Sequence, residues 1–506
     1  MSVHHTARRY AVFVVALVVT ACAGTTPRPA GEPARSAPST ADRVTLTVLQ
    51  MNDVYEITPV SGGAEGGLAR VATLRRELAS RNPNTIAVLA GDLFSPSALG
   101  TARVDGQRLA GRQIVDVMNA VGLDYATFGN HEFDLSRDEF LARMAETKTT
   151  WVSSNTRDPN GQSFPNAPNE VVFTITNGAG RAARIGMFGL TLAGPETYVR
   201  YMDPLARARE TVAALRPKVD VLIAVTHLAV AQDIALVEGV PGIDLVIGGH
   251  EHENVQVRRG RGLTPIVKAD ANARTVYVHD ITFDARAGSV DVNSRLQRIT
   301  NAIPEDPAVA ARAKGWVDKA YAAFRSQGFE AERVVATVTD TLDGTETSVR
   351  HRSTRLTELI TQGMLRSVPG AQFAVFNSGG IRIDDEIPPG RITEYDVIRT
   401  LPFGGNVVAV DMKGGLLQRV LDQGVTNAGN GGFLLVARAS AAPIEPERTY
   451  LVAFIDFLLT GNETGLAFLT RGHPDLTVRS GGPPEPDIRK TFIAELQRQY
   501  AGAAGR

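Results

Sequence analysis

The sequence predicts an α/β layered fold, and three observations support this class. Short apolar runs typical of buried strands alternate with stretches of helical periodicity from residue 43 onward. Five of the apolar runs end in residue types that commonly bind metal ions. The composition, with 43% hydrophobic and 21% charged residues, is that of a globular protein. Strand–helix alternation with such residues at strand ends favours sheets covered by helices, with a site beyond the carboxyl ends of the strands.

The elements are clearest in the first half of the chain. Residues 43–51 alternate apolar and polar side chains as a strand does. Helical periodicity, with apolar residues three and four apart, occupies residues 67–79 and 106–121. The remaining strand candidates are short apolar runs at 85–90, 183–190, 219–225 and 243–249. Their order predicts repeated strand–helix units.

The chain, at 506 residues, is long enough for two or three domains with full cores. A helical, charge-mixed stretch predicts a linker helix at 303–333, between a first domain at 43–302 and a second domain at 334–506. Basic and acidic residues nearly cancel, with 53 Lys and Arg against 54 Asp and Glu. This balance argues against nucleic-acid binding as the main function.

The N-terminus has the pattern of a targeting segment. Residues 1–22 contain a short basic stretch and an apolar run, and they end at Cys22, the only cysteine. The pattern resembles a bacterial lipoprotein signal, in which the cysteine is lipidated, and an ordinary secretory signal is the alternative. Residues 23–42 are rich in Pro, Ala, Ser, Thr and Gly and predict a flexible tether. We therefore expect an exported, membrane-anchored lipoprotein that faces the periplasm or the cell exterior.

Metal-binding residue types follow five apolar runs in sequence order. The motifs are VLQMND with Asp53, VLAGD with Asp92, ATFGNHEFD with Asn130, His131 and Asp134, LIAVTH with His227, and LVIGGHEH with His250 and His252. Two carboxylates, one amide and several imidazoles suit a pair of divalent cations that share a bridging carboxylate. Such a pair activates water and neutralises phosphoryl oxygens, so the donor set indicates a metal-dependent phosphoesterase.

These motifs resemble those of the bacterial periplasmic and animal ecto-5′-nucleotidase family, over residues from about 43 to 495. The resemblance implies a layered metallophosphoesterase β-sandwich with flanking helices and a smaller α/β C-terminal substrate domain. It also implies two metal positions with a shared carboxylate: Asp53 and His252 at the first, Asn130, His227 and His250 at the second, and Asp92 as the bridge. The ions expected are Mn, Zn or Co, with Fe as an alternative.

Two further residues of the first domain receive a catalytic role from the resemblance. His131 is not a metal ligand in the family but lies beside the phosphate as an acid or charge stabiliser. Asp134, three residues further on, orients its imidazole. We therefore expect His131 and Asp134 to form a catalytic pair.

The second domain carries substrate-binding candidates at positions that match the family. Guanidinium groups for the substrate are expected at Arg350 and Arg382, because an Arg fork suits bidentate binding of phosphate. The remaining candidates are Asn377, which opens the loop to Arg382, and Phe403 and Phe457, which match the two rings that stack on a nucleobase.

The chain departs from the family pattern at two positions. Tyr55 stands where the family usually has a histidine ligand, and a neutral phenol is a poor ligand for Zn or Mn. The first metal would then have fewer protein ligands and a weaker affinity, or Tyr55 would ligate a harder ion such as ferric iron as a phenolate. Glu463, in GNETG, stands at a usual aspartate position of the substrate domain and is one methylene longer. Base and ribose recognition could therefore differ from that of adenosine.

The resemblance implies a hydrolase of extracytoplasmic nucleotide phosphate esters that releases nucleoside and phosphate. Two other activities fit the same site, namely 2′,3′-cyclic-nucleotide phosphodiesterase and nucleotide-sugar pyrophosphatase. Tyr55 leaves open a third alternative, a catalytically impaired nucleotide-binding lipoprotein. The expected partners are a nucleotide and, through Cys22, a membrane, whereas the sequence does not set the oligomeric state.

Overall fold

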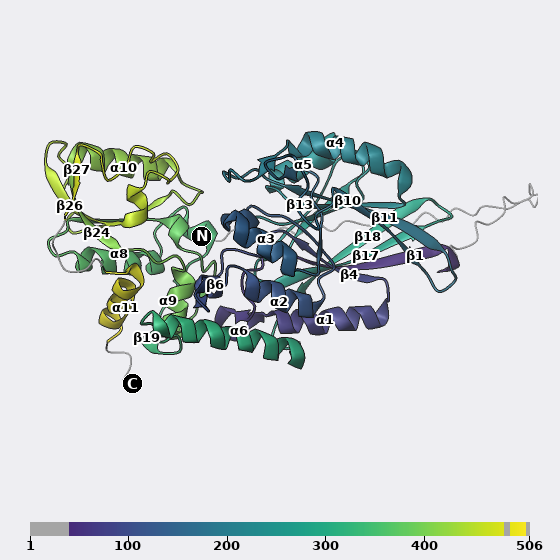
Figure 1. Cartoon of the computed structure of the whole chain (residues 1–506), viewed down its shortest axis with the longest axis horizontal. Coiled ribbons are helices and arrows are strands. Elements are labelled where there is room, and N and C mark those ends of the chain that lie inside the picture. The colour runs from purple at the N-terminus through teal and green to yellow at the C-terminus, as the bar shows by residue number, and fades with distance from the viewer. Residues whose placement is uncertain (1–39, 480–485, 502–506) are drawn as a thin grey trace, which may run out of the picture. The chain divides into compact units, whose positions relative to one another are not determined.

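Two six-stranded sheets organise the first domain of the computed structural model (Figure 1). The first sheet has the order β18 (Ser289–Arg298), β17 (Thr275–Asp284), β1 (Arg43–Met51), β4 (Thr85–Ala90), β7 (Tyr125–Thr127) and β8 (Thr150–Trp151). The second has the order β10 (Glu170–Thr176), β11 (Ala182–Thr191), β13 (Val221–His227), β14 (Leu245–Gly248), β16 (Thr264–Lys268) and β15 (Val255–Arg259). Both sheets are mixed: antiparallel neighbours stand at both edges of the second sheet, whereas in the first sheet they stand only at the β17–β18 edge and the β8 edge is parallel.

The two sheets pack face to face around an apolar core. Val48 of β1 and Val88 of β4 lie in one buried cluster with Met187 of β11 and Ile223 of β13. All four side chains are fully buried, and each such burial stabilises the fold by about 1.5–3 kcal/mol. The predicted α/β layered sandwich is therefore confirmed.

Helices cover the outer faces of the sandwich. On the first sheet lie α1 (Leu68–Arg81), α2 (Arg112–Val121) and α3 (Arg137–Glu146), and on the second α4 (Pro204–Leu215) and α5 (Val230–Gly239). Each buries an apolar stripe, as Val71 and Leu74 of α1 do against the first sheet.

The helix expected at 106–121 begins later than predicted. Residues 103–108 form a two-stranded hairpin instead, with β5 (Arg103–Val104) paired to β6 (Gln107–Arg108). The turn residues Asp105 and Gly106 have positive φ values of 53° and 81°, as a tight hairpin turn requires. The Asp-Gly pair therefore prevails over the helical periodicity, and α2 starts only after Gly111.

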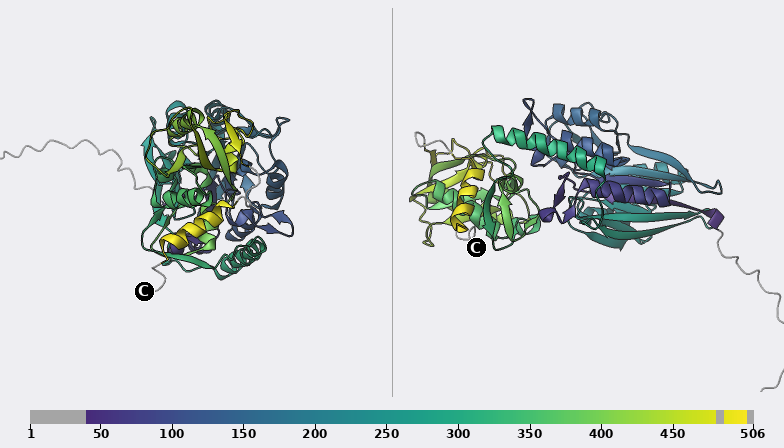
Figure 2. Two further views of the ribbon diagram at one scale, coloured as in Figure 1. Left: turned by 90° about the vertical axis from the view of Figure 1, so that its left-hand side faces the viewer. Right: turned by 90° about the horizontal axis from the view of Figure 1, so that it is seen from below.

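Most of the stretch predicted as a linker is the long helix α6 (Pro307–Ser326), which packs beside α1 and α2 (Figure 1, Figure 2). Its Trp316 Nε1 donates to Asp116 Oδ2 of α2 at 2.8 Å, and Arg312 pairs with the same carboxylate at 2.7 Å. The apolar cluster on this side of the first sheet continues through Phe324 into the second domain.

The second domain contains a five-stranded sheet with helices on both faces (Figure 1). Its order is β25 (Leu434–Arg438), β21 (Phe373–Asn377), β26 (Thr449–Ile455), β24 (Val407–Lys413) and β27 (Leu476–Val478). The accompanying helices are α7 (Glu346–Val349), α8 (Arg355–Ser367), α9 (Glu394–Thr400), α10 (Gly414–Thr426) and α11 (Ile488–Gln499).

Short strand pairs complete both domains. In the first domain, β2 (Pro59–Val60) pairs with β3 (Glu65–Gly66), and β9 (Thr156–Arg157) with β12 (Arg200–Tyr201). In the second domain, β19 (Val334–Val338) pairs with β23 (Gly390–Thr393), and β20 (Leu342–Asp343) with β22 (Glu386–Ile387).

The structure describes residues 40–479 and 486–501. Cys22, the predicted signal at 1–22 and most of the predicted tether at 23–42 lie outside these residues. Across the described ranges, no helix combines the length and the apolar character that crossing a membrane would need.

Candidate active site

The five motifs meet because their strands end at the same edge of the sandwich. Strands β1, β4 and β7 are parallel neighbours in the first sheet, and β13 and β14 are parallel neighbours in the second. The carboxyl ends of parallel strands lie on one side of a sheet, so the loops that follow them converge. His227 is the last residue of β13, and the loops carry the other predicted donors: Asp53, Asp92, Asn130, His250 and His252.

Several donors are held in strained backbone conformations. The φ angles of Asp53, Asp92, His250 and His252 are 52°, 61°, 91° and 58°. A non-glycine residue in this left-handed region costs about 1–3 kcal/mol, and such residues cluster at functional sites. Gly129 is also required, because a Cβ there would lie 2.0 Å from Asp92 Oδ1. The strain at these positions lowers the stability of the fold, and in return these side chains lie close together.

Each of the two buried aspartates has one oxygen fixed by the surrounding chain. Asp53 Oδ2 accepts from Asn52 Nδ2 at 2.8 Å and from the His250 backbone N–H at 3.0 Å. Asp92 Oδ1 accepts from the His131 backbone N–H at 2.9 Å. The other oxygens, Asp53 Oδ1 and Asp92 Oδ2, face the imidazoles. The carboxylates are therefore oriented before any ligand binds.

A metal ion fits between these carboxylates and His227. One ligand atom from each of Asp53, Asp92 and His227 lies within 4.8 Å of the others, and all three side chains are buried. The Nδ1–H of His227 donates to the Ala90 carbonyl at 2.8 Å, so Nε2 is the nitrogen that faces the carboxylates, 3.3 Å from Asp92 Oδ2. Among the described residues, His227 Nε2 and Asn130 Oδ1 are buried polar atoms without a hydrogen-bond partner. Such unpartnered nitrogen and oxygen atoms are suited to binding a cation as ligands.

The electrostatics of the cluster also call for positive charge. Burial alone would lower the pKa of His227, but the Asp92 and Asp53 carboxylates raise it to about 9. Burial and the neighbouring His227 lower the pKa of His250 to about 4, so His250 is a neutral imidazole at pH 7. The carboxylates thus favour a cation, and a neutral imidazole beside them is ready to ligate one.

Tyr55 points into the first metal position. Its Oη donates to Asp92 Oδ2 at 2.8 Å, lies 3.1 Å from His252 Nε2, and is 3.5 Å from Asp53 Oδ1. Burial raises the pKa of Tyr55 well above its usual value, and the two carboxylates raise it further. The phenol is therefore neutral and lies among the three donors predicted for that position.

His131 and Asp134 form the predicted contact. His131 Nδ1 lies 2.7 Å from Asp134 Oδ2, and Ser95 Oγ donates to the same oxygen at 3.2 Å. Burial alone would lower the pKa of His131, but the Asp92 and Asp134 carboxylates raise it above its ordinary value. With Nδ1 engaged, Nε2 is the nitrogen left for a substrate.

The second domain contributes to the same pocket. A small pocket is lined by Tyr55, His131 and His252 of the first domain and by Glu346, Arg382 and Asp384 of the second. The Arg382 guanidinium lies over the Phe403 ring, 5.6 Å from its centroid, and its Nε has no hydrogen-bond partner among the residues that the structure describes. Of the predicted substrate residues, Arg382 is thus beside His131, and Arg350 forms an ion pair with Glu346.

The other predicted substrate residues lie on loops of the second domain. Asn377 Nδ2 donates to Glu463 Oε2 at 2.7 Å, so these two form one hydrogen-bonded pair. Phe403 is 57% exposed and Phe457 41% exposed, which is unusual for phenylalanine. Across the described ranges, no ring contact joins Phe403 to Phe457. The clamp on a base stays a prediction for this pair.

Two buried charged residues that support the site were missed from the sequence. Glu132 is fully buried, and its carboxylate accepts backbone N–H groups of Asp92 at 2.9 Å and of Gly129 at 2.5 Å. Lys268, at the end of β16, is fully buried and donates to the carbonyls of Leu228 at 2.6 Å and Gly249 at 2.8 Å. Glu132 stands inside the GNHE motif, whereas Lys268 has no local signal beyond a charge that ends an apolar strand.

Comparison with known proteins agrees with this geometry. Residues 46–254 match the family of calcineurin-like phosphoesterases, and residues 334–441 match the 5′-nucleotidase C-terminal domain. A snake venom 5′-nucleotidase from Naja atra is 24% identical over 537 aligned positions, which cover 91% of this chain and 98% of that protein. The trifunctional nucleotide phosphoesterase protein YfkN of Bacillus subtilis is 29% identical over 76% of this chain, but the match spans only 28% of that longer protein.

A solved structure has the same fold. The crystal structure of a 5′-nucleotidase precursor from Thermus thermophilus superposes with a TM-score of 0.73 at 24% identity, covering 90% of this chain and 97% of that one. This likeness shows the fold. Together, the two family matches, the relatives and the buried Asp and His cluster identify the chain as a metal-dependent phosphoesterase, a 5′-nucleotidase-like hydrolase.

Proposed function

We propose that the protein hydrolyses phosphate monoesters of nucleotides and releases nucleoside and inorganic phosphate. The observation that carries this proposal is the shared pocket, in which His131 and Tyr55 of the first domain face Arg382 of the second. A phosphate at the mouth of this pocket would lie between the predicted metal donors and the Arg382 guanidinium, whose Nε has no hydrogen-bond partner within the described part of the chain. Arg382 and His131 are then complementary to the phosphoryl oxygens.

In this proposal the residues divide the work of one in-line displacement. Bound at the Asp and His cluster, two divalent ions would activate water and neutralise phosphoryl oxygens. Asp134 holds His131 Nδ1, so that His131 Nε2–H can donate to the phosphate as the ester bond breaks. Arg382 holds the phosphoryl group against this face.

Recognition of the nucleoside would fall to the loops of the second domain. Phe403 and Phe457 are exposed aromatic rings, and stacking of a base on such a ring contributes about 1–3 kcal/mol. The Asn377–Glu463 pair offers a carboxylate and an amide to hydroxyl or amino groups of the nucleoside. These contacts support a nucleotide over a simple phosphate ester.

We further propose that the enzyme acts outside the cytoplasm as a lipoprotein anchored through Cys22. The support is the sequence pattern of residues 1–22, a basic start and an apolar run that ends at the single cysteine. Cells fed labelled palmitate should label the wild-type protein and not the Cys22→Ala variant. Label on both proteins, or on neither, would contradict the anchor.

The deciding experiment is a hydrolysis screen on purified protein that has been stripped with a chelator. Nucleoside 5′-monophosphates, 2′,3′-cyclic nucleotides and nucleotide sugars are each tested with Mn, Zn, Co and Fe supplied separately. We expect no activity without metal and the highest kcat/KM for a 5′-monophosphate. Preference for a cyclic nucleotide or a nucleotide sugar would replace the proposed substrate. Nucleotide binding without turnover under any metal would instead identify a binding protein.

A further inference from the structure

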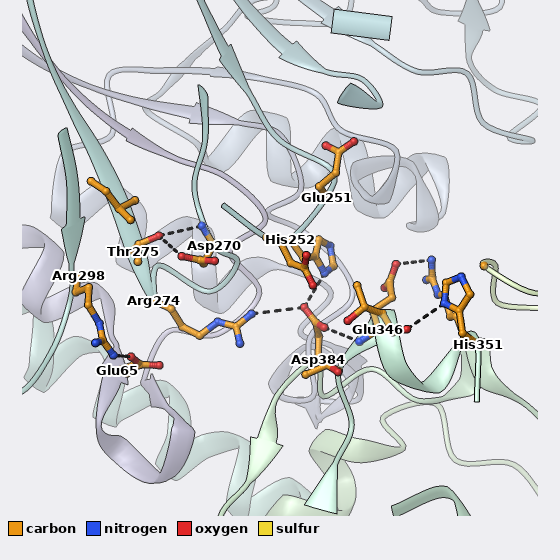
Figure 3. Close-up of a pocket in the computed structure, with 16 residues that line it drawn as sticks. Glu65, Glu251, His252, Asp270, Arg274, Thr275, Arg298, Glu346, His351 and Asp384 are labelled. Carbon is orange, nitrogen blue, oxygen red and sulfur yellow. Dashed lines mark hydrogen bonds and ion pairs between the residues drawn. The ribbon is translucent and has the colours of Figure 1, made fainter. Parts of the chain in front are cut away.

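One contact joins a predicted metal ligand to the second domain. The Asp384 carboxylate, in the loop after Arg382, places Oδ2 2.8 Å from Nδ1 of His252 (Figure 3). Both side chains are nearly buried, with 11% exposure for His252 and 12% for Asp384. A hydrogen bond between charged or polar groups is strongest in such a desolvated setting.

Asp384 is itself held from two other directions. Its Oδ1 accepts the backbone N–H of Glu346 at 2.8 Å, and Arg274 lies 3.8 Å from its Oδ2. Figure 3 shows these groups around Asp384 on the wall of a cavity of about 490 Å³. The φ of Asp384 is 39°, so the chain also maintains a strained backbone at this position. The carboxylate therefore has little freedom to turn away from His252.

This arrangement decides which nitrogen of His252 can bind a metal. With Nδ1 engaged by Asp384, only Nε2 remains, and Nε2 faces Asp53 Oδ1 at 3.5 Å. The same tautomer is fixed in His227, but there the acceptor is the Ala90 carbonyl, which belongs to the first domain. The two metal positions thus differ in where their orienting group comes from.

We propose that Asp384 is a positioning residue for the first metal position, so that the second domain completes the metal centre of the first. The proposal rests on the metal dependence of the proposed function. Because Asp384 orients His252 only while the two domains are in contact, metal binding at this position and domain contact stabilise each other. Loss of an orienting partner typically lowers metal affinity by about 10–100-fold.

Neighbouring Asp385 provides a matched control. It also reaches the first domain, where its Oδ2 accepts the Ser61 backbone N–H at 2.9 Å and its Oδ1 accepts Ser61 Oγ at 3.1 Å. Asp385 has no contact with a predicted metal donor within the described residues. Asp385→Asn therefore weakens the domain contact without disturbing His252.

The test is a zinc titration of the chelator-stripped full-length protein against a competing chelator, which resolves two successive affinities. In Asp384→Ala, we expect one affinity to fall by about 10–100-fold and the other to change less than about threefold. Asp384→Asn should lie between the wild type and Asp384→Ala, because one amide oxygen cannot accept from both His252 and Glu346. Asp385→Asn, which weakens the domain contact but keeps the Asp384–His252 hydrogen bond, should lower the first affinity much less than Asp384→Ala does.

The outcomes separate the inference from the proposed function. Wild-type protein that binds no metal would overturn the proposed function itself. Two wild-type affinities that Asp384→Ala leaves unchanged would overturn only the positioning role. An equal loss in Asp385→Asn would show that domain contact as such, and not Asp384, sets the affinity. Thermal unfolding of the chelator-stripped proteins checks that each variant folds. When zinc is added back, the rise in Tm should be smaller than in the wild type only for the Asp384 variants.

Discussion

Lys268→Met is expected to destabilise the fold by about 3–5 kcal/mol, which is the usual cost of removing one partner of a buried ion pair. The Lys268 ammonium is fully buried and lies 2.9 Å from Asp233 Oδ2, with Glu251 as a second carboxylate partner. It also donates to the carbonyls of Leu228 and Gly249, which flank the loops of two predicted metal ligands. Methionine retains the unbranched apolar stem and removes only the charge and its donors.

The size of this effect should depend on pH, and the sign follows from Asp233. Burial raises the pKa of Asp233 to about 6, while Lys268 opposes the shift and Glu251 adds to it. A carboxyl whose pKa is higher in the folded state stabilises the fold below its unfolded pKa of about 3.9, and this contribution is lost as pH rises through the folded pKa. Without the Lys268 ammonium, the pKa of Asp233 in the folded state rises further, so Lys268→Met continues to lose stability as the pH rises above 6. In this range the gap, which is the difference in free energy of unfolding between the wild type and the variant, should grow by up to about 1.4 kcal/mol per pH unit.

Urea unfolding of chelator-stripped protein at pH 6, 7 and 8 measures this gap. The control is Lys268→Met combined with Asp233→Asn, which removes the ionising group and should make the gap independent of pH. A gap that stays constant from pH 6 to 8 in Lys268→Met would refute the reasoning. The same slope in the double variant would assign it to another group.

His131→Ala should lower turnover by about 10²–10⁴-fold while bound metal, measured by atomic absorption, stays at the wild-type level; loss of metal would instead make His131 a ligand. Phe403→Ala and Arg382→Ala should raise the KM for nucleoside monophosphates far more than the KM for p-nitrophenyl phosphate. Equal changes for both substrates would argue against nucleoside binding by the second domain. Tyr55→His should lower the metal concentration needed for half-maximal activity, because an imidazole offers a lone pair that the buried phenol withholds. If Tyr55 is instead a phenolate ligand of iron, the wild type should have a visible charge-transfer band that Tyr55→Phe removes.

The sequence predicted the α/β class and the convergence of the donors because both follow from local patterns. A short apolar run that stops at Asp53 or Asp92 contains the strand, its end and the functional group within a few residues. The topology rule for parallel strands then brings such ends together without further information.

Local sequence patterns do not predict contacts between segments that are distant in the sequence. Asp384 meets His252 across 132 positions of sequence, and only the packing of the two domains makes them neighbours. Lys268 has no local signal because its partners, two backbone carbonyls and the carboxylates of Asp233 and Glu251, come from other segments of the chain. The predicted helix at 106–121 begins too early for a different reason, because the Asp105–Gly106 turn prevails over the helical periodicity around it and forms a hairpin at 103–108.

The predicted donors of the metal centre come from both sheets of the sandwich. Asp53, Asp92 and Asn130 follow strands of the first sheet, whereas His227 and His250 follow strands of the second. A cation bound among them would link the two sheets at this edge of the sandwich, much as a covalent cross-link would. Disulfides provide such reinforcement in other proteins, but a chain with one cysteine cannot form one internally. In this molecule the catalytic ions would also stabilise the contact between the two sheets. Their removal should speed amide hydrogen exchange at the ends of β1 and β13.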